Sequence, residues 1–348
     1  MKKRFLSLTL TALLAVSTMT GCGSSSDSST AASDQETYVF KFASENVATH
    51  PRNIAMSEFF EPELEKRSDG RIDVQLFTDG VLGKESELIQ MLPTDAIQGY
   101  RGAGYENLNP AFEIWSAPFV FEDYDEAGYF QTTNLARSIM DNVSDPNVYI
   151  PATGFTGFRQ IVCKKEIVHP SDLAGVTMRA PNQNPILDFY KAVKASPQNM
   201  SAADAYMALQ QGAIDGVCNP AASIDGFKYL EVADYLIEIS YCAGADPFMV
   251  SAKWYNSLPD DLKEIFDEVA QETMEYSNEL VAADDANVME KCKEKAKHYV
   301  NIIDDPGLLQ EWRDALTYVP EQAIARGTYT EEQYQELLDT MAAYREGK

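Results

Sequence analysis

The sequence is short of the residues that build metal sites and nucleic-acid surfaces. Its 348 residues contain only 3 His and 5 Cys. No two of these have the spacing of zinc ligands, so we expect no metal site. Basic residues are also scarce, with 28 Lys and Arg against 54 Asp and Glu and a net charge of −26. Because proteins bind nucleic acids mainly through cationic contacts to phosphates, this balance excludes DNA and RNA as partners.

Catalytic motifs and long apolar runs are missing as well. The sequence has no G-x-S-x-G, no H-E-x-x-H and no glycine-rich phosphate loop, so we expect neither an enzyme nor a bound cofactor. No apolar run reaches the roughly 18 residues of a transmembrane helix. The chain is 45% hydrophobic and 24% charged, as an ordinary globular protein is. Its length favours about two domains.

The first residues have the pattern of a secretory signal. Three cations, Lys2 to Arg4, precede an apolar stretch from Phe5 to about Val16, and Gly21-Cys22 follows. A Cys after small residues resembles the lipobox of bacterial lipoproteins. This resemblance implies a signal peptide at 1–21 and a lipidated Cys22. The alternative is a signal cut elsewhere, with Cys22 an ordinary thiol.

Residues 22–36 complete this N-terminal region. Beyond Cys22 they read GSSSDSSTAASDQE, which is too polar to bury a core, so we expect a flexible tether. Together these features predict an extracytoplasmic protein, periplasmic or at the cell surface, that a lipid anchors to the cell membrane. Secretion permits disulfides, but the sequence cannot pair the remaining cysteines. We expect unpaired thiols, with Cys218 and Cys242 as the pair to test among Cys163, Cys218, Cys242 and Cys292.

Strands and helices alternate in the first half of the body. Alternating apolar residues predict strands at 38–43 and 71–77. Helical spacing predicts helices at 52–66, interrupted at Pro62, and at 83–92. This alternation is typical of parallel βαβ units.

The pattern returns later and ends in a long helix. We expect strands at 155–163, 175–180 and 214–217, and helices at 183–195 and 202–212. From Pro259 to about Tyr299 the apolar spacing is helical. A helix this long either bends or connects two lobes.

Several stretches, in order, resemble one transporter family. They include KFASENVATHP (41–51), APFVFED (117–123), GFRQIVCKKEIVHPSDLAGVTMRAP (157–181), AYMALQQGAIDGVCNP (205–220) and WYNSLPDD (254–261). As an ordered set, these segments closely resemble the solute-binding proteins of tripartite ATP-independent periplasmic (TRAP) transporters. The resemblance covers residues 38 to about 275.

The resemblance implies an α/β fold like that of periplasmic binding proteins. It has two lobes, a ligand cleft between them and a long helix that links them. On this basis we assign residues 37–156 plus 245–284 to lobe one, and residues 157–244 plus 285–348 to lobe two. The lobes of this family close around a ligand by a hinge motion.

The resemblance also implies a carboxylate ligand and its contacts in lobe two. The signature Arg of the family falls on Arg179 in TMRAP, and a second Arg falls on Arg159. A guanidinium pairs with a carboxylate through two parallel, charge-assisted hydrogen bonds. The family Asn falls on Asn219, which follows Cys218 where the family usually has Glu or another polar residue.

Other ligand contacts are expected at four positions. Glu45 and Glu85 match polar positions of lobe one, where carboxylates accept hydrogen bonds from sugar hydroxyls. Arg101 matches an Arg in the branch that takes uronic and related sugar acids. Tyr241 stands where that branch often has His, and we expect it to stack on a sugar or to belong to the core. We interpret His50 as structural.

The sequence therefore predicts a capture protein for a small organic acid. We expect a monomer that binds a uronate-like sugar acid and delivers it to integral membrane permease subunits driven by an ion gradient. A C4-dicarboxylate or keto acid is the alternative ligand. The alternative roles are a sensor subunit that presents its ligand, a binding protein of an ABC importer, or a secreted enzyme acting on a sugar acid.

Overall fold

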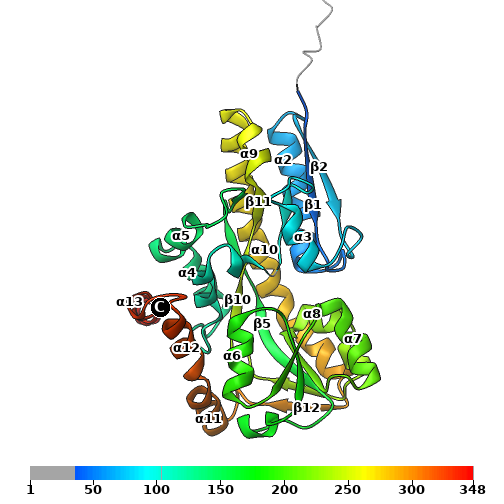
Figure 1. Ribbon diagram of the computed structural model, residues 1–348, viewed down its shortest axis with the longest axis vertical. Helices are drawn as coiled ribbons and strands as arrows, with labels where there is room; N and C mark the ends of the chain where they lie inside the picture. The colour runs from blue at the N-terminus through cyan, green and yellow to red at the C-terminus, as the bar shows by residue number, and fades with distance from the viewer. Residues whose placement is uncertain (1–35, 103, 348) are drawn as a thin grey trace, which may run out of the picture. The chain divides into compact units, whose positions relative to one another are not determined.

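Two β-sheets, each covered by helices, make up the part of the chain that the computed structural model describes, residues 36–102 and 104–347 (Figure 1). The predicted signal peptide, Cys22 and all but the last residue of the predicted tether lie outside these described residues. We call the part built around the five-stranded sheet lobe one, and the part built around the seven-stranded sheet lobe two. The expected two-lobed α/β fold is confirmed.

The sheet of lobe one has the strand order β2-β1-β3-β11-β4. Strand β1 pairs in parallel with β2 and β3, as the βαβ pattern predicts. Strand β11 is antiparallel to β3, because here the chain returns from lobe two. The bounds are β1 Tyr38–Ala43, β2 Ile72–Phe77, β3 Gly99–Tyr100, β4 Val148–Tyr149 and β11 Met249–Ser251.

The first helical region is continuous through the expected break. A π-helical segment, η1, precedes Pro62, which lies in the first turn of α2. Proline has no N–H to donate and its ring crowds the preceding turn, and the wider turn accommodates both effects. The helical segments of this lobe are α1 Pro51–Ala55, η1 Met56–Phe60, α2 Glu61–Arg67, α3 Glu85–Met91, η2 Tyr105–Asn107, η3 Pro110–Ser116, α4 Tyr124–Gln131, α5 Asn134–Asp141 and α9 Ala252–Ser257.

The sheet of lobe two has the order β12-β9-β5-β8-β6-β7, and β10 also pairs with β5. Strand β5 is antiparallel to β8, β9 and β10, so this sheet is mixed rather than parallel. The bounds are β5 Thr153–Cys163, β6 Thr177–Ala180, β7 Ser196–Asn199, β8 Gly216–Pro220, β9 Tyr235–Glu238, β10 Ala243–Pro247 and β12 His298–Asn301.

Helices flank this second sheet. Helix α7 ends at Gly212, whose φ of 77° lies in the left-handed region, as the sequence predicts for a helix stop. Cys163, Cys218, Cys242 and Cys292 are all free and buried, which confirms the expectation of unpaired thiols. The helical segments are η4 Pro170–Leu173, α6 Asn184–Ala192, α7 Ala202–Gln211, α8 Ala221–Gly226, η5 Tyr229–Glu231, α11 Pro306–Leu316 and α12 Tyr318–Arg326.

The long helix α10, Asp260–Lys295, passes from one lobe to the other (Figure 1). Its first half packs Phe266 and Val269 into the core around β1, and its last turns pack Met289 and Cys292 into the core around α8. The helix ends earlier than predicted. The next residues form β12, which pairs in parallel with β9 and uses the backbone groups that a longer helix would need.

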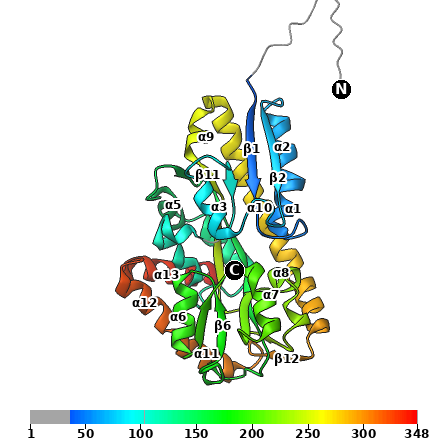
Figure 2. The ribbon, with the colours of Figure 1, turned by 45° about the vertical axis from the view of Figure 1, so that its right-hand side comes forward.

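The last helix, α13 Glu331–Glu346, departs from the expected division into lobes. Its Leu337 and Met341 belong to the same core cluster as Phe130 of α4 and Ile139 of α5. Figure 2 shows α13 just below α5. The prediction that residues 285–348 belong to lobe two is therefore wrong for this helix. Leu337 and Met341 are four residues apart and share a face, and lobe one supplies the apolar surface that covers it.

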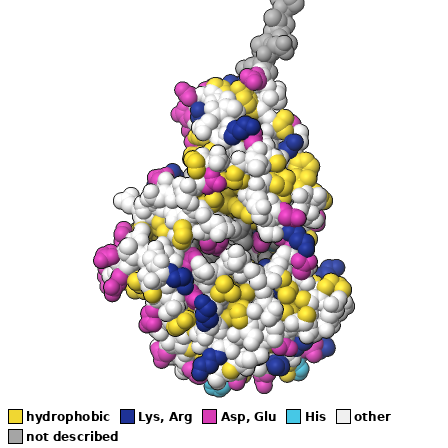
Figure 3. All heavy atoms as spheres, in the orientation of Figure 1, with side chains coloured by type: hydrophobic (Ala, Val, Ile, Leu, Met, Phe, Trp, Pro, Cys, Tyr) yellow, Lys and Arg dark blue, Asp and Glu magenta, His cyan; other side chains and the backbone are white. Residues whose placement is uncertain are grey.

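On the face that Figure 3 shows, acidic side chains are spread widely and basic ones are dispersed among them. Within the described ranges, none of the helices is both long and apolar enough to cross a membrane.

Candidate functional site

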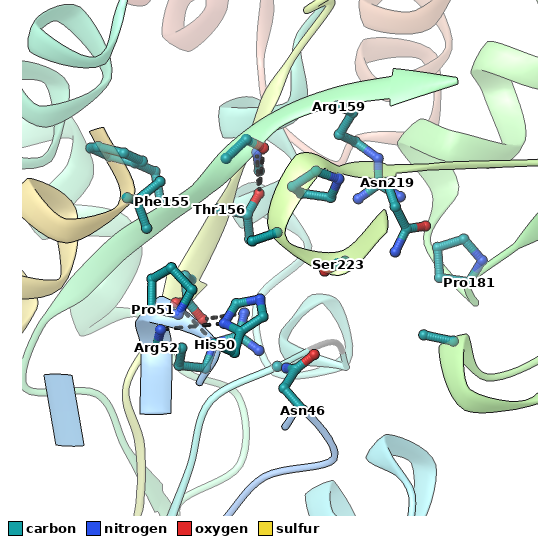
Figure 4. A pocket seen from close by; sticks show the side chains of 18 of the residues that line it. Asn46, His50, Pro51, Arg52, Phe155, Thr156, Arg159, Pro181, Asn219 and Ser223 are labelled. Atoms are coloured by element: carbon teal, nitrogen blue, oxygen red, sulfur yellow. Dashed lines mark hydrogen bonds and ion pairs between the residues drawn. The ribbon is translucent and has the colours of Figure 1, made fainter. Parts of the chain in front are cut away.

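A cavity of about 100 Å³ lies where the two lobes meet α10. Lobe one contributes the start of α1 and of α3, lobe two contributes β5, β6 and β8, and α10 contributes Val281 to Val288. In Figure 4, Arg159 and Asn219 approach each other on one side, while Asn46, His50 and Arg52 lie on the other. A cavity of this volume is large enough for several water molecules, so a small organic molecule can occupy it.

Three predicted residues come together on lobe two. Arg159 is on β5, Asn219 on β8 and Arg179 on β6, and β8 lies between the other two strands. All three line the cavity. The structure inserts β8 between the two strands that carry the arginines. This insertion places the asparagine between the two arginines.

Both arginines are buried, and neither forms a salt bridge with a carboxylate of the described residues. Arg159 is 8% exposed and Arg179 is 3% exposed. Arg159 Nη2 donates to the carbonyl of Cys218, and Arg179 donates to the carbonyl of Met200 (2.9 Å) and to Asn219 Oδ1 (3.4 Å). Arg159 Nε has no partner among the described residues. A buried cation costs several kcal/mol unless an anion compensates it, so this pair favours an anionic ligand.

Glu85 lines the cavity from the first turn of α3, as predicted. Glu45 is not among the lining residues, because its carboxylate bridges the two lobes instead. It accepts hydrogen bonds from the backbone N–H of Glu85 (3.0 Å) and of Ala203 (3.1 Å), near the starts of α3 and α7. Burial, and then the nearby Glu85, raise the pKa of Glu45. Next to this bridge, Lys84 pairs with Asp204 across the lobes at 2.7 Å.

Arg101 does not line the cavity, contrary to the prediction. Its side chain is fully buried and donates to Asp246 (2.5 Å) and to Ser277 (2.9 Å). Asp246 also pairs with Arg52 at 2.9 Å. The two guanidinium groups hold the pKa of Asp246 below its ordinary value although burial opposes this shift. The partner of Arg101 lies 145 residues away in the sequence, so local motifs could not reveal it.

Tyr241 belongs to the core of lobe two and does not line the cavity. It is 1% exposed, and its ring stacks on Phe189 with the centroids 4.6 Å apart. Of the two predictions for this residue, the core position is the one that the structure supports.

The sequence analysis missed several polar residues of the cavity, among them His50 and Asp285. His50, interpreted as structural, lines it, and its Nδ1 accepts from Arg52 N at 3.3 Å, so Nε2 carries the proton. Burial and the neighbouring Arg52 lower the pKa of His50 to about 3, so the ring is neutral. Asp285 lines the cavity from α10, and burial raises its pKa to about 6. Its spacing from Val281 and Val288 is helical, which was the available signal.

The site defines a class of protein. A cavity between two lobes, lined by buried cations and closed by contacts across the lobes, belongs to a binding protein for anionic solutes. The comparisons with known proteins agree. Residues 42–326 match the bacterial extracellular solute-binding proteins, family 7 (DctP), and the chain belongs to this family. It is a solute-binding protein of the TRAP type.

Relatives and solved structures of this family share most of the chain. A C4-dicarboxylate-binding periplasmic protein of Vibrio cholerae is 27% identical over 78% of this chain and 81% of its own. The structure of a TRAP protein of Pseudomonas putida F1 with bound D-glucuronate has a TM-score of 0.79 and 25% identity, over 88% of this chain and 97% of that one. A Haemophilus influenzae TRAP protein with bound L-gulonate has a TM-score of 0.80 and 22% identity, over 88% and 99%.

Proposed function

We propose that this protein captures a small sugar acid in the cavity and delivers it to TRAP permease subunits in the membrane. The observation that carries the proposal is the pair of buried arginines, Arg159 and Arg179, which form no salt bridge with a carboxylate of the described residues. An arginine cannot escape burial by losing its proton. A ligand carboxylate supplies the missing charge and receives parallel hydrogen bonds in return.

The rest of the lining favours hydroxyl groups on the ligand. Asn219 and His50 offer N–H donors, while Glu85 and Asp285 offer acceptors. A hydroxyl both donates and accepts, so it suits this mixed set, whereas a second carboxylate needs donors alone. The bound L-gulonate and D-glucuronate of the two solved relatives have this chemistry.

A C4-dicarboxylate is the second candidate ligand. Arg52 also lines the cavity, on the side away from the arginine pair, and is a third cation there. The relative from Vibrio cholerae is named for such a ligand. Against this alternative, Arg52 already pairs with Asp246 through both carboxylate oxygens.

Membrane attachment through Cys22 is a further part of the proposal. It is supported by the lipobox resemblance of the sequence alone, since Cys22 lies outside the described residues. Labelling of the wild-type protein with a radioactive fatty acid in a bacterial host, lost in Cys22→Ser, tests this attachment. Equal labelling of both proteins would refute it.

The decisive experiment is a thermal-shift screen against sugar acids, dicarboxylates, keto acids and neutral sugars. A ligand that binds only the folded state stabilises it by about 2.7 kcal/mol at a hundredfold excess over Kd. We expect one acid to give a large shift that Arg179→Met abolishes. Arg137→Ala, which removes an exposed surface arginine paired with Asp141, is the control that keeps the shift. Shifts with neutral sugars alone, or shifts indifferent to Arg179→Met, would refute the carboxylate site.

A further inference from the structure

Asp285 lies against a part of β5 that has no side chain. A Cβ added at Gly157 would lie 3.3 Å from Asp285 Oδ1, 3.2 Å from Pro220 Cβ and 3.4 Å from the Tyr124 hydroxyl. Gly157, Asp285 and Pro220 line the cavity, whereas Tyr124 does not. A side chain at Gly157 would therefore fill the space in front of the Asp285 carboxylate, and glycine leaves it open.

The same strand carries Arg159, which forms no salt bridge with a carboxylate of the described residues. Gly157 and Arg159 are two residues apart on β5, and both line the cavity. Arg159 is 8% exposed, and its Nε has no hydrogen-bond partner among the described residues. A ligand carboxylate that pairs with Arg159 therefore places the neighbouring ligand atoms over Gly157, in reach of Asp285.

Asp285 itself keeps hydrogen-bonding capacity for a ligand. Its protein partner is the Tyr124 hydroxyl, which donates its single proton to Asp285 and accepts from Phe158 N at 3.1 Å. None of the salt bridges among the described residues involves Asp285, and its neighbour Asp284 also lines the cavity. A carboxylate accepts about four hydrogen bonds, so most of this capacity is unused.

We infer that Asp285 is a specificity-determining residue that accepts a hydrogen bond from a ligand hydroxyl and disfavours a second ligand carboxylate. The inference rests on the proposed function, because it requires an acid held by Arg159 and Arg179. It narrows the substrate class to hydroxylated monocarboxylates. A dicarboxylate of the same length would bring its second negative charge toward the carboxylates of Asp284 and Asp285. Like charges brought close together repel, so such a ligand would bind more weakly.

The test uses L-gulonate and D-glucarate, which share their stereocentres and differ only in a terminal CH₂OH or carboxylate. Isothermal calorimetry measures both Kd values for the full-length protein and for Asp285→Asn. We expect the wild type to prefer L-gulonate by about tenfold or more, and Asp285→Asn to lose about tenfold of that preference. Glu279→Gln removes an exposed charge from the same helix and should leave the preference unchanged.

The outcomes separate this inference from the proposed function. If the wild type binds neither these acids nor any other acid, the proposed function fails. If acids bind but the preference survives in Asp285→Asn, or the wild type prefers D-glucarate, only the inference fails. Should Asp285→Asn not fold, Asp285→Glu keeps the charge and moves the oxygens. The Asp285→Glu variant should bind L-gulonate more weakly than the wild type and should still disfavour D-glucarate. Unchanged L-gulonate binding would overturn the inference.

Discussion

The two lobes treat buried arginines in opposite ways. Arg52 and Arg101 of lobe one share the carboxylate of Asp246 on β10, and all three side chains are buried. In lobe two, Arg159 and Arg179 are equally buried, yet they contact carbonyl and amide oxygens and no carboxylate of the described residues. The residue type and the burial are the same, so the difference lies in the source of the counter-charge.

This contrast separates a structural role from a binding role. The arginines of lobe one receive their anion, Asp246 of β10, from the chain itself, so their interaction is complete in the folded protein. Those of lobe two are oriented by neutral acceptors, which fix the guanidinium groups without neutralising them. Their charge remains available to a ligand, and closure of the lobes is favoured by as much as the ligand prefers the closed state.

The largest expected effect comes from removing Asp246, the anion that Arg52 and Arg101 share. Asp246→Asn leaves two buried guanidinium groups unpaired, and breaking a buried ion pair in this way costs about 3–5 kcal/mol of the free energy of unfolding. Arg179→Met removes a cation that forms no salt bridge among the described residues, so without ligand its cost should be smaller, about 1–2 kcal/mol for the lost hydrogen bonds to Met200 and Asn219. Urea unfolding of both variants measures the difference. Equal losses would abolish the distinction between the two arginine pairs.

Glu106 is a buried acid that forms no salt bridge with a cation of the described residues. It accepts from Gln183 Nε2 across the lobes at 2.6 Å and from Gly104 N at 3.1 Å. Burial raises its pKa from an ordinary 4.5 to about 7. A carboxylate can thus escape an unpaired burial by taking up a proton, which an arginine cannot do.

The pH dependence that follows has a definite sign. Between about pH 4.5 and 7 the folded state keeps a proton on Glu106 that the unfolded state has released. Stability therefore falls as the pH rises through this window, by up to about 3 kcal/mol from this group. Glu106→Gln should remove this part of the slope and be more stable than the wild type at pH 8. Unfolding free energies at pH 5 and pH 8 check this, and an unchanged slope would contradict it.

Local sequence patterns predicted most of the fold correctly. The strand at 38–43 matches β1, the strand at 155–163 lies within β5, and the long helix connects the lobes. What failed were pairings decided by distant partners. Strand β12 exists because β9 offers it an edge, and α13 joins lobe one because α4 and α5 cover its apolar face.

The predicted site residues fall into two groups for the same reason. Arg159, Arg179 and Asn219 line the cavity, as their motifs indicated. Arg101 and Tyr241 do not, because Asp246 and Phe189 engage them, and neither partner is close in sequence. A motif shows that a residue type recurs at a position, whereas its partner decides whether the charge or ring is available to a ligand.

The smallest expected effect is at the exposed ion pair between the lobes. Lys84 and Asp204 are both about half exposed, with side-chain exposures of 48% and 52%. Water and salt screen such a pair, so Lys84→Ala should change the Kd for the ligand by about twofold or less. Glu45→Gln removes one acceptor from the buried bridge to Glu85 and Ala203, and should weaken binding by about tenfold. Kd values of both variants at low and at high salt make the comparison. A larger loss in Lys84→Ala than in Glu45→Gln would mean that the exposed pair, rather than the buried carboxylate, holds the lobes closed.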